Sequence, residues 1–519
     1  MNTVKLVRQL ALALVLVLVG LGASAQTKDL RININADPEM IDPVTFSALI
    51  AGDVLRNVYE NFTRVDETGK VLPALALKWT VSSDNLSWRF ELRPNVKFHT
   101  GRPFGAKDVK SSFEALLAPG SKAGLQLQYL QRIVGAKDVQ DGKTRELVGV
   151  KAVSPLVVEV NFSAPDVLFP VYPFMFFDTQ VVADKGPNWF MQVSAGTGPY
   201  MFSEWKRGQT VYLKAFKDYY GGAPKIDGVR FVVVPSEETA VTMYEAGELD
   251  ILSIASTDLN RRIMRDAKLK AQAQTAPAAQ INFLGMNQNL YAPFKDKRIR
   301  EAFCISIDRD ALTRGLMGGL AQPLYGQITP GIAGYNPAVK KIAYDPDRAR
   351  KLLADAGYAG GRGLPPLKIA NLAPFRNEIA YYADQWKQVL GVQVDLDIQE
   401  RATFLRSLNA GETPFFSWGW SAGYPDALYY LSQVWHSKSP FNRARYSNPG
   451  FDALIDRATI TADNETRYRQ YHAAEALLLD DWGTCGLFMR TAVALVKPNV
   501  KGVVLGPMRM LPYAKVTVN

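Results

Sequence analysis

The sequence predicts an α/β protein with two or three domains, on three observations. The chain has 519 residues, which is too many for one compact core. It is 47% hydrophobic and 21% charged and has no low-complexity segment, as is typical of ordered globular proteins. Strand and helix patterns alternate over residues 368–398, and this alternation indicates a partly parallel sheet.

The first 25 residues differ in composition from the rest of the chain. Lys5 and Arg8 precede an apolar run over residues 11–21, and small residues follow at 23–25. This pattern is typical of a secretory signal peptide, with cleavage before Gln26. The alternative is an N-terminal membrane anchor, for which the apolar run is too short. No cysteine follows the cleavage position, so we expect a periplasmic protein that is not a lipoprotein.

The charge distribution bears on the binding partner, and the cysteine content bears on disulfide formation. The net charge is +10, and loss of Lys5 and Arg8 with the signal peptide would lower it by two. Basic and acidic residues are interspersed without a Lys/Arg run, which argues against a nucleic-acid partner. Cys304 and Cys485 are the only cysteines. They either form a disulfide in an oxidising compartment or remain two buried thiols, and the sequence leaves both possibilities open.

Residues 195–252 carry the most informative pattern. The glycines and the proline at 196–199 predict a turn, because glycine allows positive φ and proline fixes φ. Thr210–Ala215 alternates polar and apolar side chains at the strand period, and 229–234 is a β-branched run. Ser236 is expected to cap a helix that Gly247 ends.

This stretch resembles the signature of the bacterial extracellular solute-binding proteins of family five, the oligopeptide- and dipeptide-binding proteins of ABC importers. The matching residues are Gly196 to Tyr200, Trp205, Gly208, Tyr219, Pro224 to Asp227, Val234, Pro235 and Gly247 to Asp250. The resemblance implies a two-lobed α/β periplasmic binding protein of the Venus-flytrap, cluster C type, with an extra inserted subdomain. It also implies a solute ligand, an inner-membrane permease with ATPase subunits, a monomer, and neither enzyme activity nor a metal or cofactor.

The family pattern also divides the chain. Lobe I is expected at 26–59, 183–283 and 488–519, its inserted subdomain at 60–182, and lobe II at 284–487. Strands near 280–285 and 487–490 would form the hinge. Within this frame we expect helices over 106–117, 301–312, 345–357, 377–390 and 467–482, a strand over 156–162, and an aromatic core segment over 165–177.

Residues 413–431 match the family's principal ligand loop. An aromatic strand over 415–420 leads to a turn, and Trp418, Trp420, Tyr424 and Asp426 are candidate ligand residues. In peptide-binding relatives an aspartate of this loop pairs with the peptide's α-amino group, and that position is Gly423 here. Asp426 either replaces this carboxylate or caps the following helix, and both roles stay open.

Three further candidates lie outside this loop. Thr45 and Phe46 belong to a segment that approaches the ligand in the family, and the alternative is a simple loop. Arg376 follows a strand close to where some relatives place a carboxylate-binding arginine, and the alternative is an exposed helix start. A buried ammonium without a carboxylate is costly. Other members of the family take non-peptide solutes, so the resemblance leaves open a peptide or a non-peptide solute such as a sugar, an opine, a metal complex or haem.

A rival interpretation is a serine hydrolase. Residues 419–423 read G-x-S-x-G between a strand and a helix, which is the context of a nucleophile elbow around Ser421. Asp456 and His472 follow in the order of a catalytic triad. However, Pro425 interrupts the helix that should begin directly after the serine, so the hydrolase remains a minor alternative.

Overall fold

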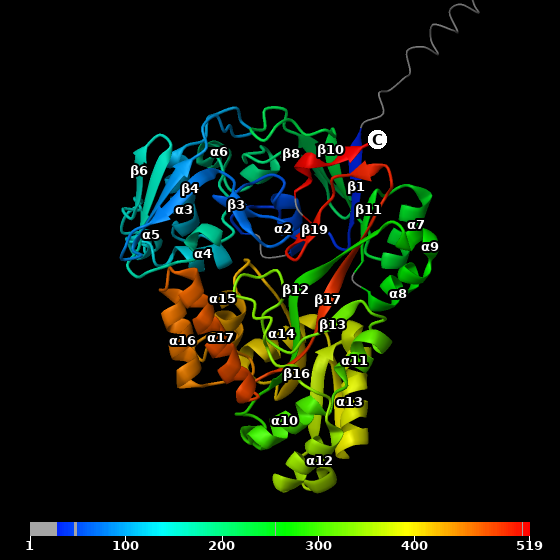
Figure 1. Ribbon diagram of the computed structural model, residues 1–519. Helices are drawn as coiled ribbons and strands as arrows, with labels where there is room; N and C mark the ends of the chain where they lie inside the picture. The colour runs from blue at the N-terminus through cyan, green and yellow to red at the C-terminus, as the bar shows by residue number, and fades with distance from the viewer. Residues whose placement is uncertain (1–27, 46–48, 255, 511) are drawn as a thin grey trace, which may run out of the picture.

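The computed structural model describes residues 28–45, 49–254, 256–510 and 512–519. The expected signal peptide and Phe46 lie outside these residues. The described chain forms two lobes joined by long strands, with both the inserted subdomain and the C-terminus in the upper lobe of Figure 1. Within these ranges no helix is long and apolar enough to span a bilayer.

One large sheet passes through both lobes. Its strand order is β15-β14-β16-β12-β17-β11-β1-β10-β9-β8, with β13 paired to β17. The bounds are β1 Asp29–Ile34, β8 Tyr200–Lys206, β9 Thr210–Ala215, β10 Gly228–Val233, β11 Ile251–Ser253, β12 Ala273–Met286, β13 Ala321–Pro323, β14 Leu367–Leu372, β15 Val394–Gln399, β16 Phe415–Ser421 and β17 Cys485–Val496.

The two longest strands, β12 and β17, connect the lobes. They pair antiparallel from Ala273 to Leu284, with a register shift between Pro277 and Ile281. At this irregularity the Ala279 N–H donates to the Pro507 carbonyl at 2.9 Å. Bulges of this kind bend and twist a strand. The expected hinge segments at 280–285 and 487–490 lie within these two strands, and their hinge role stays a prediction.

The upper lobe confirms the expected order of elements over 195–252. Strands β8, β9 and β10 are followed by helix α7 (Glu237–Ala246). The Ser236 hydroxyl accepts the Thr239 N–H at 3.2 Å, and Gly247 ends the helix with a φ of 81°. Strand β1 pairs parallel to β10, so the N-terminal strand lies inside the sheet of this lobe.

Residues 60–182 contain a separate four-stranded antiparallel sheet of order β4-β5-β7-β6. The bounds are β4 Ala76–Val81, β5 Ser87–Leu92, β6 Val150–Ser154 and β7 Val157–Asn161, with helices α3 Ala106–Leu117, α4 Leu125–Leu130 and α5 Ala136–Gln140. Phe62 stacks on Phe90 at 4.0 Å between ring centroids, and Phe169 packs beside them. The expected aromatic core is therefore present.

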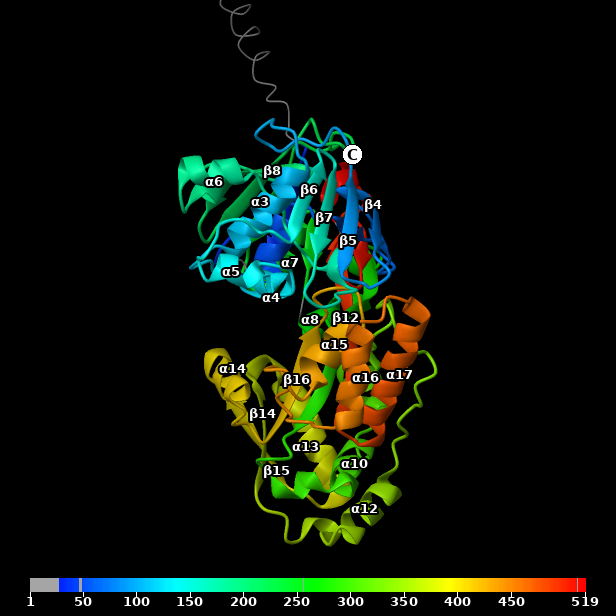
Figure 2. The same cartoon turned by 90° about the vertical axis from the view of Figure 1, so that its left-hand side faces the viewer.

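The lower lobe contains the predicted βαβ unit. Strands β14 and β15 pair in parallel, and α13 (Arg376–Leu390) connects them. Figure 2 shows α14 (Arg401–Ala410) on one side of β16 and α16 and α17 on the other. In Figure 1, α16 lies directly beneath the inserted subdomain.

One helix prediction in this lobe is wrong, and another is confirmed to within a few residues at each end. The helix expected over 301–312 is instead α10 (Lys297–Ile305) and a new turn, α11 (Arg309–Ala311). The break occurs because the Asp308 carboxylate accepts the Ala311 N–H and starts a second helix. The helix expected over 467–482 is α17 (Asn464–Asp480), and the preceding α16 (Pro449–Thr459) was not predicted.

A disulfide joins α10 to the first residue of β17. Cys304 and Cys485 are bonded, with their Cα atoms 5.7 Å apart. The buried Arg309 guanidinium donates from Nη2 to both sulfur atoms, at 2.9 and 3.1 Å. Of the two possibilities left open by the sequence, the structure has the disulfide.

Candidate ligand-binding site

An aromatic pocket lies on one face of the sheet in the lower lobe. The side chains that line it are Phe283, Phe416, Trp418, Trp420, Val434, Trp435, Phe441, Arg443 and Ala444. Successive residues of a strand point to opposite faces, so Phe416, Trp418 and Trp420 of β16 share one face. The two candidate tryptophans of the sequence analysis therefore belong to one pocket. In this form the side chains fill it so closely that a ligand could enter only after they move apart.

The loop over residues 436–446 supplies Phe441 and Arg443 to this pocket. Asn442 holds the loop from inside, with an exposed fraction of 1%. Its Nδ2 donates to the carbonyls of Trp435, His436 and Tyr446 at 3.3, 3.3 and 2.7 Å. Its Oδ1 accepts the Tyr446 N–H at 3.1 Å. One buried amide thus fixes both ends of the loop.

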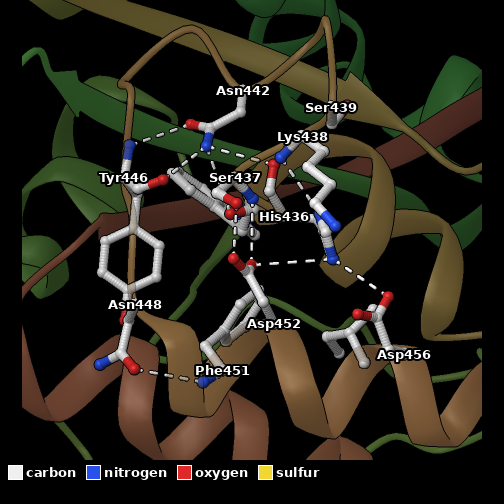
Figure 3. Close-up of polar contacts among 12 residues, drawn as sticks. His436, Ser437, Lys438, Ser439, Asn442, Tyr446, Asn448, Phe451, Asp452 and Asp456 are labelled. Atoms are coloured by element: carbon white, nitrogen blue, oxygen red, sulfur yellow. Dashed lines mark hydrogen bonds and ion pairs between the residues drawn. The ribbon is translucent and has the colours of Figure 1, made fainter.

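A second set of contacts anchors the start of this loop to α16 (Figure 3). The Asp452 carboxylate accepts the Ser437 N–H at 3.0 Å and the Ser437 hydroxyl at 2.5 Å. His436 Nδ1 accepts the Lys438 N–H at 3.2 Å, so in the neutral ring Nε2 carries the proton and donates to Asp456 Oδ1 at 3.2 Å. The loop is therefore a rigid support for the pocket.

Arg443 places a positive charge inside the aromatic pocket. Its guanidinium carbon lies 5.3 Å from the ring centroid of Trp418 and 5.5 Å from that of Trp420. Nη2 donates to Asn409 Oδ1 of α14 at 2.8 Å. The side chain belongs to a residue that is only 8% exposed. Burial lowers the pKa of Arg443 to about 10, and the group stays cationic at neutral pH.

A continuous row of rings leads from the pocket to the other lobe. Centroid distances are 5.3 Å for Phe441–Trp420, 6.3 Å for Trp420–Tyr429, 4.9 Å for Tyr429–Tyr424 and 5.3 Å for Tyr424–Tyr172. Tyr172 belongs to the inserted subdomain. Tyr424, a predicted site residue, is therefore the point where the lower lobe contacts the inserted subdomain beside the pocket.

The carboxylate of Asp426 is occupied within the lower lobe. Its Oδ1 accepts the Leu428 N–H at 2.9 Å and the Tyr471 hydroxyl at 2.7 Å, and Arg467 Nη2 lies 3.6 Å from Oδ2. Burial raises the pKa of Asp426, while Arg467 opposes this rise. Of the two roles expected for Asp426, these contacts support the cap of the following helix, since Leu428 begins helix α15 (Leu428–Tyr430).

The space beside Gly423 is filled by a tyrosine. A Cβ atom on Gly423 would lie 2.7 Å from Cε2 and 2.9 Å from the hydroxyl oxygen of Tyr429. Separations below about 3 Å are too short for carbon contacts, so any side chain at Gly423 must displace this ring. Tyr429 thus presents an aromatic ring beside Gly423.

Thr45 and Arg376 are not among the residues that line the pocket. The Thr45 hydroxyl donates to Asp42 Oδ2 at 3.0 Å within a local turn. Arg376 is the exposed first residue of α13. Phe46 lies outside the described residues. A ligand role for these three residues stays a prediction without a contact in its support.

The arrangement contradicts the serine hydrolase alternative. Ser421 ends β16 opposite Gln280, and the next helix begins only at Leu428. Asp456 contacts His436, and His472 Nε2 contacts the Gly334 carbonyl at 3.1 Å. The acid and the base of the expected triad therefore have other partners, and no Ser421–His472 hydrogen bond occurs in the described chain.

Phe441, Arg443 and Tyr429 were not predicted as site residues from the sequence. Phe441 and Arg443 lie in a loop after Pro440 that shows no strand or helix period. The sequence pattern therefore does not show where their side chains point. The available signal was compositional: the segment from Phe441 to Arg445 combines one aromatic residue with two arginines. Only the folded loop brings these groups to Trp418 and Trp420.

Comparison with known proteins gives the family. The model of the bacterial extracellular solute-binding proteins, family 5 middle region, matches residues 70–442. The periplasmic oligopeptide-binding protein OppA of Salmonella typhimurium is 29% identical, with 91% of this chain and 88% of that protein covered. The periplasmic murein peptide-binding protein MppA of Escherichia coli is 26% identical, with 93% and 91% covered.

A solved structure agrees with these relatives. The crystal structure of Haemophilus influenzae OppA in complex with RPPGFSPFR superimposes with a TM-score of 0.75 at 25% identity, covering 95% of this chain and 99% of that one. The fold class expected from the sequence, a two-lobed α/β binding protein, is confirmed. The chain belongs to the bacterial extracellular solute-binding proteins of family 5, which are binding proteins rather than enzymes.

Proposed function

We propose that this protein captures a peptide or a related solute between its two lobes and delivers it to the membrane permease of an ABC importer. The observation that carries the proposal is the aromatic pocket of Trp418, Trp420 and Phe441, joined by a row of rings to the inserted subdomain. Mostly apolar pockets with a few oriented polar groups are typical of small-ligand sites.

The similarity to peptide-binding relatives supports a peptide as the ligand. These relatives are a murein peptide-binding and an oligopeptide-binding protein of the periplasm, and the chain covers about nine tenths of each. The periplasm is therefore the compartment in which this protein would work, after cleavage of the expected signal peptide. The disulfide between Cys304 and Cys485 is compatible with an oxidising compartment.

The mechanism would be a shift in population between open and closed forms. Tyr424 of the lower lobe contacts Tyr172 of the inserted subdomain. A ligand that contacts both lobes stabilises the closed form by its differential affinity for the two forms. The permease would then recognise the closed form, and β12 and β17 would absorb the change.

Native mass spectrometry of the protein purified from a periplasm tests the ligand class. We expect bound masses that correspond to short peptides after denaturing release. A single non-peptide mass would contradict the peptide assignment while leaving solute binding intact.

The site is tested by Trp420→Ala in isothermal titration with the recovered ligand. Truncation of a central aromatic residue should weaken binding by at least about 30-fold, the equivalent of roughly 2 kcal/mol. Trp79→Ala, a partly buried tryptophan of β4, is the matched control and should leave Kd unchanged. If Trp420→Ala binds within about twofold of the wild type, the pocket is not the site.

A further inference from the structure

The pocket of the lower lobe holds hydrogen-bond donors without acceptors. Nε and Nη1 of Arg443 and the indole Nε1 atoms of Trp418, Trp420 and Trp435 are buried, and none of these five nitrogens has a partner in the described chain. All of them can only donate. No aspartate or glutamate is among the pocket-lining residues of this part of the structure.

Two other buried arginines of the lower lobe, Arg300 and Arg309, have acceptors within the fold. Arg300 donates to the carbonyls of Phe294, Lys295, Asp481 and Trp482. Arg309 donates to the carbonyls of Gly486, Cys304 and Ile307 and to both cysteine sulfurs. These guanidinium groups are satisfied by the fold itself. Arg443 has one side-chain acceptor, Asn409.

The unsatisfied arginine is costly for folding alone. Burial of a donor without an acceptor lowers stability, and more so when the group is charged. Contacts with the two tryptophan faces offset only part of this cost. The rigid loop held by Asn442 nevertheless fixes Arg443 in this position. Such preorganisation favours a partner that is absent from the chain.

We propose that Arg443 is the binding group for a carboxylate of the transported ligand, held between Trp418 and Trp420. A planar guanidinium matches a carboxylate with parallel N–H···O bonds, whereas a ligand ammonium would meet only donors and a like charge. The inference rests on the proposed function and specifies its ligand: a peptide anchored by a carboxylate instead of by its α-amino group. Gly423, where the family has its aspartate, fits this exchange.

The carboxylate could be the peptide's C-terminus or an acidic side chain. The probes are pools of two- to five-residue peptides of alanine and phenylalanine, made as free acids and as C-terminal amides. A third pool carries one glutamate in an amidated peptide. Binding is followed by titration calorimetry to the wild type and to Arg443→Gln, which keeps amide donors but removes the charge. Arg445→Gln, two residues further along the same loop, is the matched control.

We expect the wild type to prefer a carboxylate pool over the plain amide pool by at least about 30-fold, and Arg443→Gln to lose this preference. Preference for the free acids identifies the C-terminus, and preference for the glutamate pool identifies a side chain. Arg445→Gln should behave like the wild type. Equal affinity of the wild type for all three pools would overturn the inference while leaving peptide binding intact.

If no peptide pool binds, the peptide assignment fails, and a second measurement still tests Arg443. Tryptophan fluorescence is titrated with propionate and with neutral propionamide. A saturable change that propionate alone produces, and that Arg443→Gln abolishes, supports a carboxylate site. The same response to both compounds, or no response, overturns it.

Discussion

Glu475 has a buried carboxyl group, and only one of its two oxygens has a hydrogen-bond partner in the described chain. Its Oε1 accepts the Gln327 N–H at 2.6 Å, whereas Oε2 has no partner in the described chain. Burial raises the pKa of Glu475 from 4.5 to about 7. The folded protein therefore holds a proton that the unfolded chain releases above pH 4.5. The stability from this group is complete below pH 4.5 and is lost as the pH rises through about 7.

Glu475→Gln should therefore stabilise the protein at pH 8 and have little effect at pH 5. The expected gain in the free energy of unfolding at pH 8 is at most about 3 kcal/mol, from 1.36 kcal/mol per pKa unit. Urea unfolding at both pH values measures it. Glu465→Gln, an exposed acid on the same helix, is the control. An equal effect of Glu475→Gln at both pH values would contradict the assignment.

Gly423 and Tyr429 form a second pair whose coupling can be tested. Gly423→Asp introduces a carboxylate but forces the Tyr429 ring to move, and overpacking of this kind costs about 1–3 kcal/mol. Gly423→Asp with Tyr429→Ala should recover most of that loss. A double-mutant cycle by urea unfolding checks the prediction. Additive effects of the two substitutions would show that the ring does not occupy this space.

The disulfide ties α10 to the strand that connects the lobes. Residues 304 and 485 are 181 positions apart, so the bond restricts a long loop of the unfolded chain. Cys304→Ala with Cys485→Ala should lower the free energy of unfolding by about 2–4 kcal/mol. The intact protein, denatured without reductant, should not react with iodoacetamide. Alkylation of both cysteines under those conditions would contradict the disulfide.

Elements with a strong local signal were predictable from the sequence. Of the pocket, Trp418 and Trp420 were predicted, whereas Phe441 and Arg443 were not. Strand β16 follows its aromatic alternation, and α7 follows its Ser236 cap and Gly247 end. Helix α10 ends early because Asp308 caps a new turn, a local competition that periodicity does not show. The position of Arg443 in the pocket could not be predicted from the sequence, because an irregular loop held by Asn442 brings it there.

Aromatic side chains of the lower lobe and of the inserted subdomain are in contact in this structure. Tyr424 packs against Tyr172, and Tyr172 stacks on Tyr129 at 4.3 Å. Removal of the Tyr424 ring should favour separation of the lobes, because it removes a contact between them. Tyr424→Ala should increase the radius of gyration in solution scattering without ligand, and ligand should reduce it again. Tyr335→Ala, an exposed tyrosine of the same lobe, should have no effect.

The most direct measurement is a crystal structure of the protein with the ligand that copurifies from the periplasm. The ligand is predicted to lie between the lobes against Trp418 and Trp420, with a carboxylate oxygen within hydrogen-bond distance of Arg443. A ligand bound outside this pocket, or one whose ammonium group occupies it, would contradict the account.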